Sequence, residues 1–141
     1  MNKPPPWFAV LAVLALLWNL AGLFAVVADL KLSAAEIAAL PLDQQALYRA
    51  RPGWSVVASV VAVVGGTLGC IGLLLRRRWA VPALAASLVG VVVQDIGIFV
   101  VAGAASVAGP VPMVLQSVVF AIAVGLLLLA RRAGARSWLL P

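Results

Sequence analysis

The chain has 141 residues, of which 65% are hydrophobic and 10% are charged, and its formal net charge is +6. A soluble domain usually carries about 25% charged residues, and a chain this short could not bury so much apolar surface in one core. The basic residues form short clusters beside apolar segments instead of covering a polar face, so we expect no nucleic-acid partner. We predict a single transmembrane domain over residues 1–141.

The sequence offers few of the groups that enzymes use for catalysis. It has no histidine and one cysteine, Cys70, which excludes an imidazole base, a histidine haem ligand and an intramolecular disulfide. The apolar segments contain no pair of carboxylates for acid–base chemistry. We therefore predict a protein that is not an enzyme, with no catalytic residue, no metal site and no cofactor.

Four apolar segments are long enough to cross a bilayer, which requires about 20 helical residues. Trp7, Trp54 and Trp79 mark three of their ends, and Trp138 follows the last one, as is typical of helices that stop at the headgroup level. These segments predict an all-α integral membrane four-helix bundle with spans at residues 7–28, 54–75, 79–101 and 111–130.

The segment between the first two spans, residues 29–53, should lie outside the cytoplasm and form two short helices. Ser33-Ala-Ala-Glu36 fits a capping box for the first of them. Asp43 is placed to cap the second, which Pro52 should end. Two interpretations of this short helical loop remain open: a lid over a binding site, or a connector that rests on the membrane surface.

Positive charge is unequally divided between the two sides of the predicted spans. Seven of the ten Lys and Arg residues fall on the side of the termini and of the second loop, a tight turn. Cytoplasmic loops carry the excess of Lys and Arg, so we predict that both termini are cytoplasmic. The residues that set this topology are Arg76, Arg77, Arg78, Arg131 and Arg132, with Lys3 and Arg136.

Small residues at helical spacing predict which side of each span packs against its neighbours, because membrane helices associate by close backbone approach. The clearest stripe lies in the second span and includes a GxxxG match: Ala58, Ala62, Gly65, Gly69 and Gly72. Shorter stripes are predicted in the first span (Ala12, Ala15, Asn19, Gly22), the third (Ser87, Gly90, Gln94, Gly97) and the fourth (Ser117, Ala121, Gly125).

Five polar residues inside the spans form the predicted site: Asn19, Ser59, Gln94, Asp95 and Gln116. With about 1.5 Å of rise per residue, they fall at similar depths, roughly 19–24 Å from the cytoplasmic edge. Asp95 is the one acidic residue inside a span, and an unpaired carboxylate in hydrocarbon should be neutral or reach water. Either it titrates or binds a cation in a polar pocket, or it hydrogen-bonds to Gln94, Asn19 or Gln116 and fixes the helix register.

Several short motifs in and between the first three spans are distinctive: Trp18-Asn19-Leu20, Leu47-Tyr48 with Pro52-Gly-Trp54, Gly66-Thr-Leu-Gly69, and Leu73-Leu-Leu-Arg-Arg-Arg-Trp-Ala80. In these motifs the chain resembles a family of small bacterial four-helix membrane proteins, some of which carry the label of sugar transporter. The resemblance extends into the third span. It implies the inner membrane of a bacterium as the location.

Two classes of function follow from these expectations. The first is a structural or accessory membrane component that acts through another membrane protein or through a second copy of itself. The second is a small oligomeric transporter or channel with Asp95 in its pathway. In both classes the lipid bilayer is the immediate partner.

Overall fold

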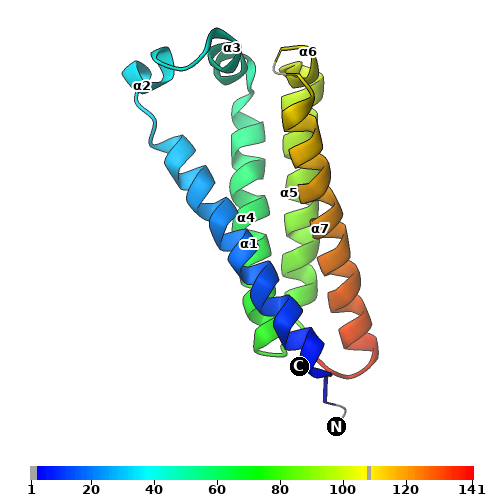
Figure 1. Cartoon of the computed structure of the whole chain (residues 1–141). Helices are drawn as coiled ribbons and strands as arrows, with labels where there is room; N and C mark the ends of the chain where they lie inside the picture. The colour runs from blue at the N-terminus through cyan, green and yellow to red at the C-terminus, as the bar shows by residue number, and fades with distance from the viewer. Residues whose placement is uncertain (1–2, 108) are drawn as a thin grey trace.

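The computed structural model describes residues 3–107 and 109–141, and long helices joined by short ones account for most of them (Figure 1). The long helices are α1 (Pro6–Leu30), α4 (Gly53–Leu74), α5 (Ala80–Asp95), which continues as the π-helix η1 (Ile96–Val101), and α7 (Pro110–Ala135). The short helices are α2 (Ala34–Ala38), α3 (Leu42–Ala50) and α6 (Ala104–Val107).

Within the described residues, four helical segments are long and apolar enough to span a membrane: α1, α4, α5 with η1, and α7. Their length and composition are those of a multi-pass membrane protein. Prolines begin α1 and α7, where a missing backbone N–H costs no helical hydrogen bond. The last helix continues beyond its predicted limit to Ala135, so Arg131 and Arg132 lie in its final turns.

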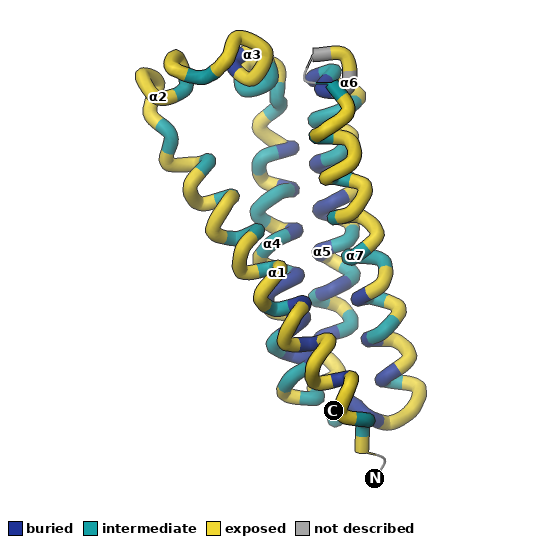
Figure 2. Tube along the Cα trace, viewed as in Figure 1, coloured by how far each residue is buried: buried dark blue, intermediate teal, exposed yellow. Residues whose placement is uncertain are grey.

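The central unit is the antiparallel hairpin of α4 and α5, with α1 packed on α4 and α7 packed on α5 (Figure 1). We call the end with both termini and the Arg76–Arg78 turn the basic end, and the end with α2, α3 and α6 the loop end. From the basic end, α1 crosses α4 and tilts away from the other helices (Figure 1). Figure 2 shows that exposed positions dominate α1 and α7, whereas buried positions concentrate on α4 and α5.

Glycines allow the backbones of α4 and α5 to lie in direct contact. A Cβ at Gly65 would lie 3.0 Å from the carbonyl oxygen of Ala83, and one at Gly90 would lie 2.7 Å from that of Ala58. Each distance is too short for an ordinary side-chain contact, so only glycine fits there without a shift of the helices. The predicted small-residue stripe of the second span thus lies on the side of α4 that faces α5.

Serine hydroxyls link the same two helices. Ser87 of α5 donates a hydrogen bond to the carbonyl oxygen of Ala62 at 2.6 Å. Ser55 of α4 donates to the carbonyl oxygen of Gln94 at 3.3 Å, and both serines are buried. Hydrogen bonds between membrane helices stabilise their association by about 0.6–2 kcal/mol each.

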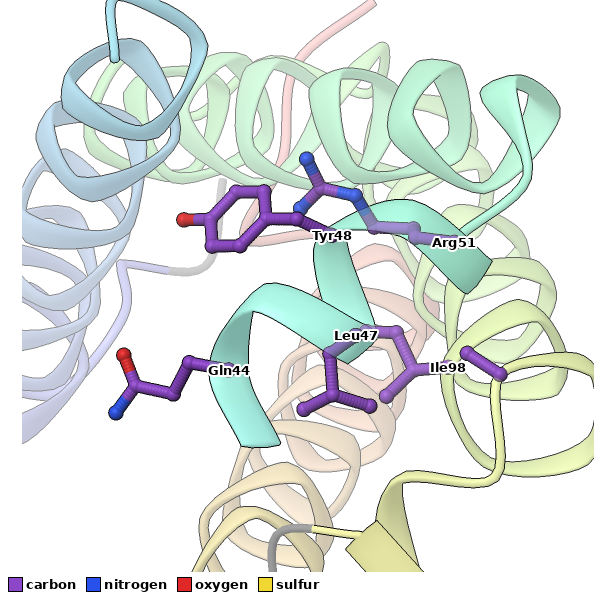
Figure 3. Close-up of a pocket in the computed structure, with 6 residues that line it drawn as sticks. Gln44, Leu47, Tyr48, Arg51 and Ile98 are labelled. Atoms are coloured by element: carbon purple, nitrogen blue, oxygen red, sulfur yellow. The ribbon is translucent and has the colours of Figure 1, made fainter. Parts of the chain in front are cut away.

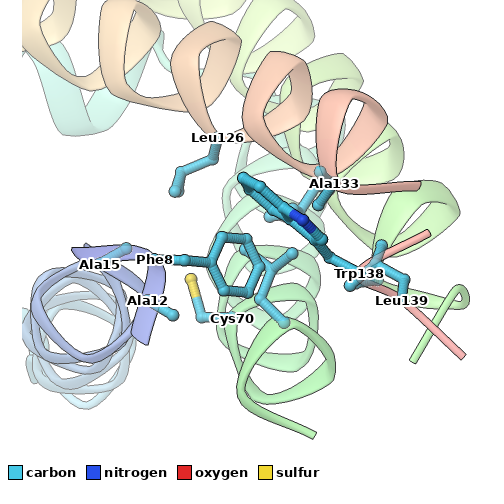
Figure 4. Packing of buried hydrophobic residues seen from close by; sticks show 12 residues of the cluster. Phe8, Ala12, Ala15, Cys70, Leu126, Ala133, Trp138 and Leu139 are labelled. Atoms are coloured by element: carbon cyan, nitrogen blue, oxygen red, sulfur yellow. The ribbon is translucent and has the colours of Figure 1, made fainter. Parts of the chain in front are cut away.

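The basic end has the tightest apolar core, and it includes a residue from beyond the last helix (Figure 4). Trp138 is 6% exposed and packs edge-on against Phe8, with ring centroids 5.5 Å apart. The tail is fixed by backbone hydrogen bonds: the amide of Arg78 donates to the carbonyl oxygen of Leu140 at 2.8 Å. The side chain of Arg76 donates to the carbonyl oxygen of Trp138 at 2.9 Å. Trp138 therefore closes a core instead of only marking a helix end.

The loop end confirms one predicted cap and corrects another. Ser33 and Glu36 form the full capping box of α2. Asp43 does not cap α3, because that helix begins one residue earlier, at Leu42, directly after Pro41. Gln45 is the residue that joins the two helices: its side-chain amide donates to the carbonyl oxygens of Ala38 and Leu40, at 3.0 and 2.7 Å.

The small-residue stripe predicted to pack in the fourth span is wrong, because its residues are exposed: Ser117, Ala121 and Gly125. The buried residues of α7 are instead Leu126, Ala130 and Ala133, near the basic end. Among the described helices α7 packs mainly against α5, so a single contact face is enough. The small-residue spacing of α7 does not coincide with that face.

Candidate functional site: a lateral groove between α1 and α7

A groove with a volume of about 340 Å³ lies between α1 and α7, and residues of α4 and α5 form its floor. It exists because α1 tilts away from the hairpin and presents small residues there: Ala21, Gly22 and Ala25. The lining is mainly apolar. Four residues with uncharged polar side chains interrupt it, one from α1, two from α5 and one from α7: Asn19, Ser87, Gln94 and Gln116.

Gln94 and Gln116 pair across the groove floor. The side-chain amide of Gln94 donates to the side-chain oxygen of Gln116 at 3.2 Å, which links α5 to α7. Gln94 is 8% exposed. A carboxamide has two donor hydrogens and an acceptor oxygen with two lone pairs, so this single bond leaves most of the capacity of both side chains unused.

Asn19 lies on the opposite wall of the groove, at the place where α1 crosses α4. Its side-chain amide donates to the carbonyl oxygen of Ala15 at 2.9 Å and to the Sγ of Cys70 at 3.5 Å. Its carboxamide oxygen lies against Gly66. Asn19 thus combines a position in the lining with a structural contact to α4.

The structure divides the predicted polar cluster. Asn19, Gln94 and Gln116 line one groove, but Ser59 and Asp95 do not. Ser59 donates to the carbonyl oxygen of Ser55 in its own helix, at 3.1 Å. Depth along a helix does not fix the direction of a side chain around the axis, so it could not separate these residues.

Asp95 is buried at one oxygen. Its Oδ1 accepts no hydrogen bond from any residue that the structure describes. Asp95 follows Gln94 directly, and successive residues of a helix project about 100° apart, so it points away from the groove. The expected hydrogen bonds from Asp95 to Gln94, Asn19 or Gln116 are not formed.

A second, smaller pocket of about 180 Å³ lies at the loop end, between α3 and the chain around Ile98 (Figure 3). One wall is a polar cluster. Arg51 forms an ion pair with Asp29 at 3.1 Å and lies over the ring of Tyr48, 4.8 Å from its centroid. The Tyr48 hydroxyl also donates to Asp29. Burial, followed by this hydrogen bond and the Asp29 charge, raises the pKa of Tyr48 to about 12.

The cluster of Asp29, Tyr48 and Arg51 ties α3 to the end of α1. No described residue of α2 or α3 lines the lateral groove. The loop between the first two spans is therefore a bracket at the loop end and does not cover this groove. Residues of α3 line the smaller pocket instead, so the lid interpretation stays a hypothesis for that pocket alone.

The polar groups that line the groove are uncharged, and they can donate and accept hydrogen bonds. Its described lining contains no Asp, Glu, Lys or Arg side chain, and no three His, Cys, Asp or Glu residues gather anywhere in the described chain. Such a lining can bind a neutral group that offers hydrogen-bond donors or acceptors within an apolar body. It offers no group that could act as a strong general acid or base.

The four long apolar helices define the class: a small multi-pass membrane protein, here with a groove on its flank. Comparison of the chain with family models, curated proteins and solved structures gives no match. The family suggested by the short motifs therefore stays an expectation.

Proposed function

We propose that the protein is a non-enzymatic accessory component of a bacterial inner membrane, with both termini in the cytoplasm, and that it binds a transmembrane helix of another protein in the lateral groove. The observation that carries this proposal is the uncharged carboxamide pair, Gln94 with Gln116, in a groove that opens on the flank of the molecule.

Unused hydrogen-bonding capacity supports a helix as the occupant. Neither the oxygen of Gln94 nor the amide nitrogen of Gln116 has a hydrogen-bond partner among the described residues, and neither atom is fully buried. In lipid, such groups gain by pairing with a polar side chain or backbone group of a neighbouring helix. The exposed apolar surfaces of α1 and α7 beside the groove supply the remaining contact.

Site-specific photo-crosslinking in native membranes tests this proposal. Val119 lines the groove, whereas Val118, the next residue of α7, is 44% exposed and lies outside it. Benzoylphenylalanine at position 119 should give one discrete crosslinked protein, and the same probe at position 118 should not. Gln116→Leu should weaken the crosslink. A product of twice the chain mass would indicate self-association, and equal labelling from both positions would reject a binding groove.

Asp95 keeps a second function open. Its buried Oδ1 has no partner among the described residues, which is the state expected of a group that exchanges a proton or a cation during transport. In this alternative, the protein is a small oligomeric transporter or channel and other copies complete the pathway around Asp95. Coupled uptake that depends on Asp95 would favour it over the accessory role.

A further inference from the structure

A third cavity, which we call the basic-end cavity, continues the lateral groove toward the basic end. Its volume is about 440 Å³, and its lining, which comes from α1 and α7, contains no charged side chain. It shares Trp18, Ile122 and Leu126 with the groove. Along α1 it extends from Leu11 to Trp18, about 10 Å at the rise of an α-helix.

Basic residues lie at the end of the molecule toward which this cavity runs. On α7, Arg132 follows Leu129 of the cavity wall by three residues, so both lie on one side of the helix. Arg131, Arg132 and Lys3 are all exposed. Neither Arg131 nor Arg132 has an ion pair or hydrogen bond with another described side chain. The four acidic residues of the chain all lie elsewhere: Asp29, Glu36, Asp43 and Asp95.

An apolar slot with guanidinium groups at one end, which pair with no other side chain that the structure describes, matches an amphiphile with an anionic head. We propose that the basic-end cavity binds one acyl chain of an anionic phospholipid, whose phosphate is held by Arg132, while Arg131 and Lys3 add positive charge at the same end of the molecule. Arginine suits this role because its planar guanidinium binds phosphate through two parallel hydrogen bonds. One leaflet of a bilayer provides about 15 Å of hydrocarbon, so a chain in the slot stays within its own leaflet.

The size and position of the cavity favour a lipid over a soluble phosphate. Inorganic phosphate would contact the arginines but would leave the apolar slot open. A zwitterionic lipid would fill the slot but would bring a cationic group to a positively charged mouth. Only an anionic lipid satisfies both parts. This inference does not depend on the proposed partner helix. That helix would contact Gln94 and Gln116, which line the lateral groove but not the basic-end cavity.

The full-length protein in dodecyl maltoside micelles provides the test, with native mass spectrometry as the readout. Dioleoyl phosphatidylglycerol should remain bound after desolvation at concentrations where dioleoyl phosphatidylcholine does not. Arg131→Gln combined with Arg132→Gln should weaken phosphatidylglycerol binding at least about tenfold. The matched control is Arg77→Gln with Arg78→Gln, which removes the same charge at the same end from exposed residues of the α4–α5 turn and should leave binding unchanged.

A cavity-filling variant tests the slot without a change of charge. Gly125 lines the cavity, and a Cβ at this position would meet no atom within 4 Å, so Gly125→Leu should fold and exclude the acyl chain. The control is Ala121→Leu, one turn away on α7, at an exposed residue that does not line the cavity. Loss of lipid binding in Gly125→Leu alone supports the proposal. Equal binding of both lipids, equal loss in the two arginine pairs, or unchanged binding in Gly125→Leu would each overturn it.

Discussion

The side-chain oxygen of Asn19 occupies the space that a Cβ of residue 66 would need, so the glycine at position 66 allows α1 to pack closely against α4. The hydroxyl of Ser87 lies 3.2 Å from the same Cβ position, so α1, α4 and α5 meet at this level. From here toward the loop end α1 leaves the hairpin, and the lateral groove opens. The Asn19–Gly66 contact therefore sets how closely α1 approaches α4 beside the groove.

Gly66→Ala should destabilise the protein, because the added methyl group overlaps the carboxamide of Asn19 and must displace α1. Overpacking of this kind costs about 1–3 kcal/mol. Gly134→Ala is the matched control, since a Cβ there meets no atom within 4 Å and alanine favours the helix. Thermal unfolding in detergent should show a lower midpoint for the first variant only. Equal midpoints would mean that Asn19 moves aside at no cost.

The Gln94–Gln116 hydrogen bond should contribute measurably to the packing of α5 on α7. In a double-mutant cycle with Gln94→Leu and Gln116→Leu, we expect a coupling free energy of about 0.6–2 kcal/mol, as found for hydrogen bonds between membrane helices. Unfolding in mixed micelles with increasing sodium dodecyl sulfate provides the measurement. A coupling energy close to zero would show that the two carboxamides act independently, and the groove floor would then lose its proposed link.

Asp95→Asn separates the two proposed functions. An accessory protein should tolerate the change, with unaltered folded yield and an unaltered crosslink from position 119, because Asp95 does not line the groove. A coupled transporter should fold but lose pH-dependent uptake, because asparagine cannot ionise. Asp43→Asn, on the exposed helix α3, is the control for the loss of one carboxylate. Loss of the crosslink in Asp95→Asn alone would contradict the accessory role as we describe it.

Tyr48 should titrate abnormally, and it can be followed directly because it is the only tyrosine in the sequence. Burial and the bond to Asp29 raise its pKa to about 12, above the ordinary value of 10.0. The raised pKa stabilises the fold fully below pH 10, and this stabilisation is lost as the pH rises through 12. Tyrosinate absorbance in folded and denatured protein gives both pKa values. Identical titrations would show that the cluster with Asp29 is not formed in solution.

A reporter fused after Pro141 through a flexible linker should be active in the cytoplasm. The reason is the division of basic residues, seven of ten of which lie at the end that carries both termini. A paired alkaline phosphatase and green fluorescent protein fusion gives the comparison. Activity of the phosphatase at this position would overturn the proposed orientation and the even number of spans.

The sequence predicted helix number, length and the inner side of α4, because these depend on composition and on spacing within one segment. Gly65 and Gly90 were recognisable since close backbone approach needs a missing side chain. The prediction for the small-residue stripe of α7 is wrong for a physical reason. Small residues at helical spacing mark one side of a helix, but they do not show whether another helix packs against that side. Ser117 and Ala121 remain exposed for that reason.

The polar site was predicted from the depth of each residue along its helix. Depth does not determine the direction in which a side chain projects from the helix axis. Gln94 and Gln116 meet, while Asp95 points elsewhere. The role of Trp138 could not be foreseen either. Hydrogen bonds to the backbone of the tail, from residues far apart in the sequence, hold Trp138 in place. No periodic pattern in the sequence predicts such bonds. Apolar residues after a basic helix end were the only available signal.

The closure by Trp138 also sets an order of events during synthesis. The core at the basic end contains Phe8 from α1 and Cys70 from α4. Trp138, in contrast, is translated after all four long helices. Until the last helix has entered the membrane and the tail has folded back, that core lacks its final side chain. Cys70 is 0% exposed once the core is complete and is the only thiol in the chain. Loss of maleimide reactivity at Cys70 therefore reports when this core is complete.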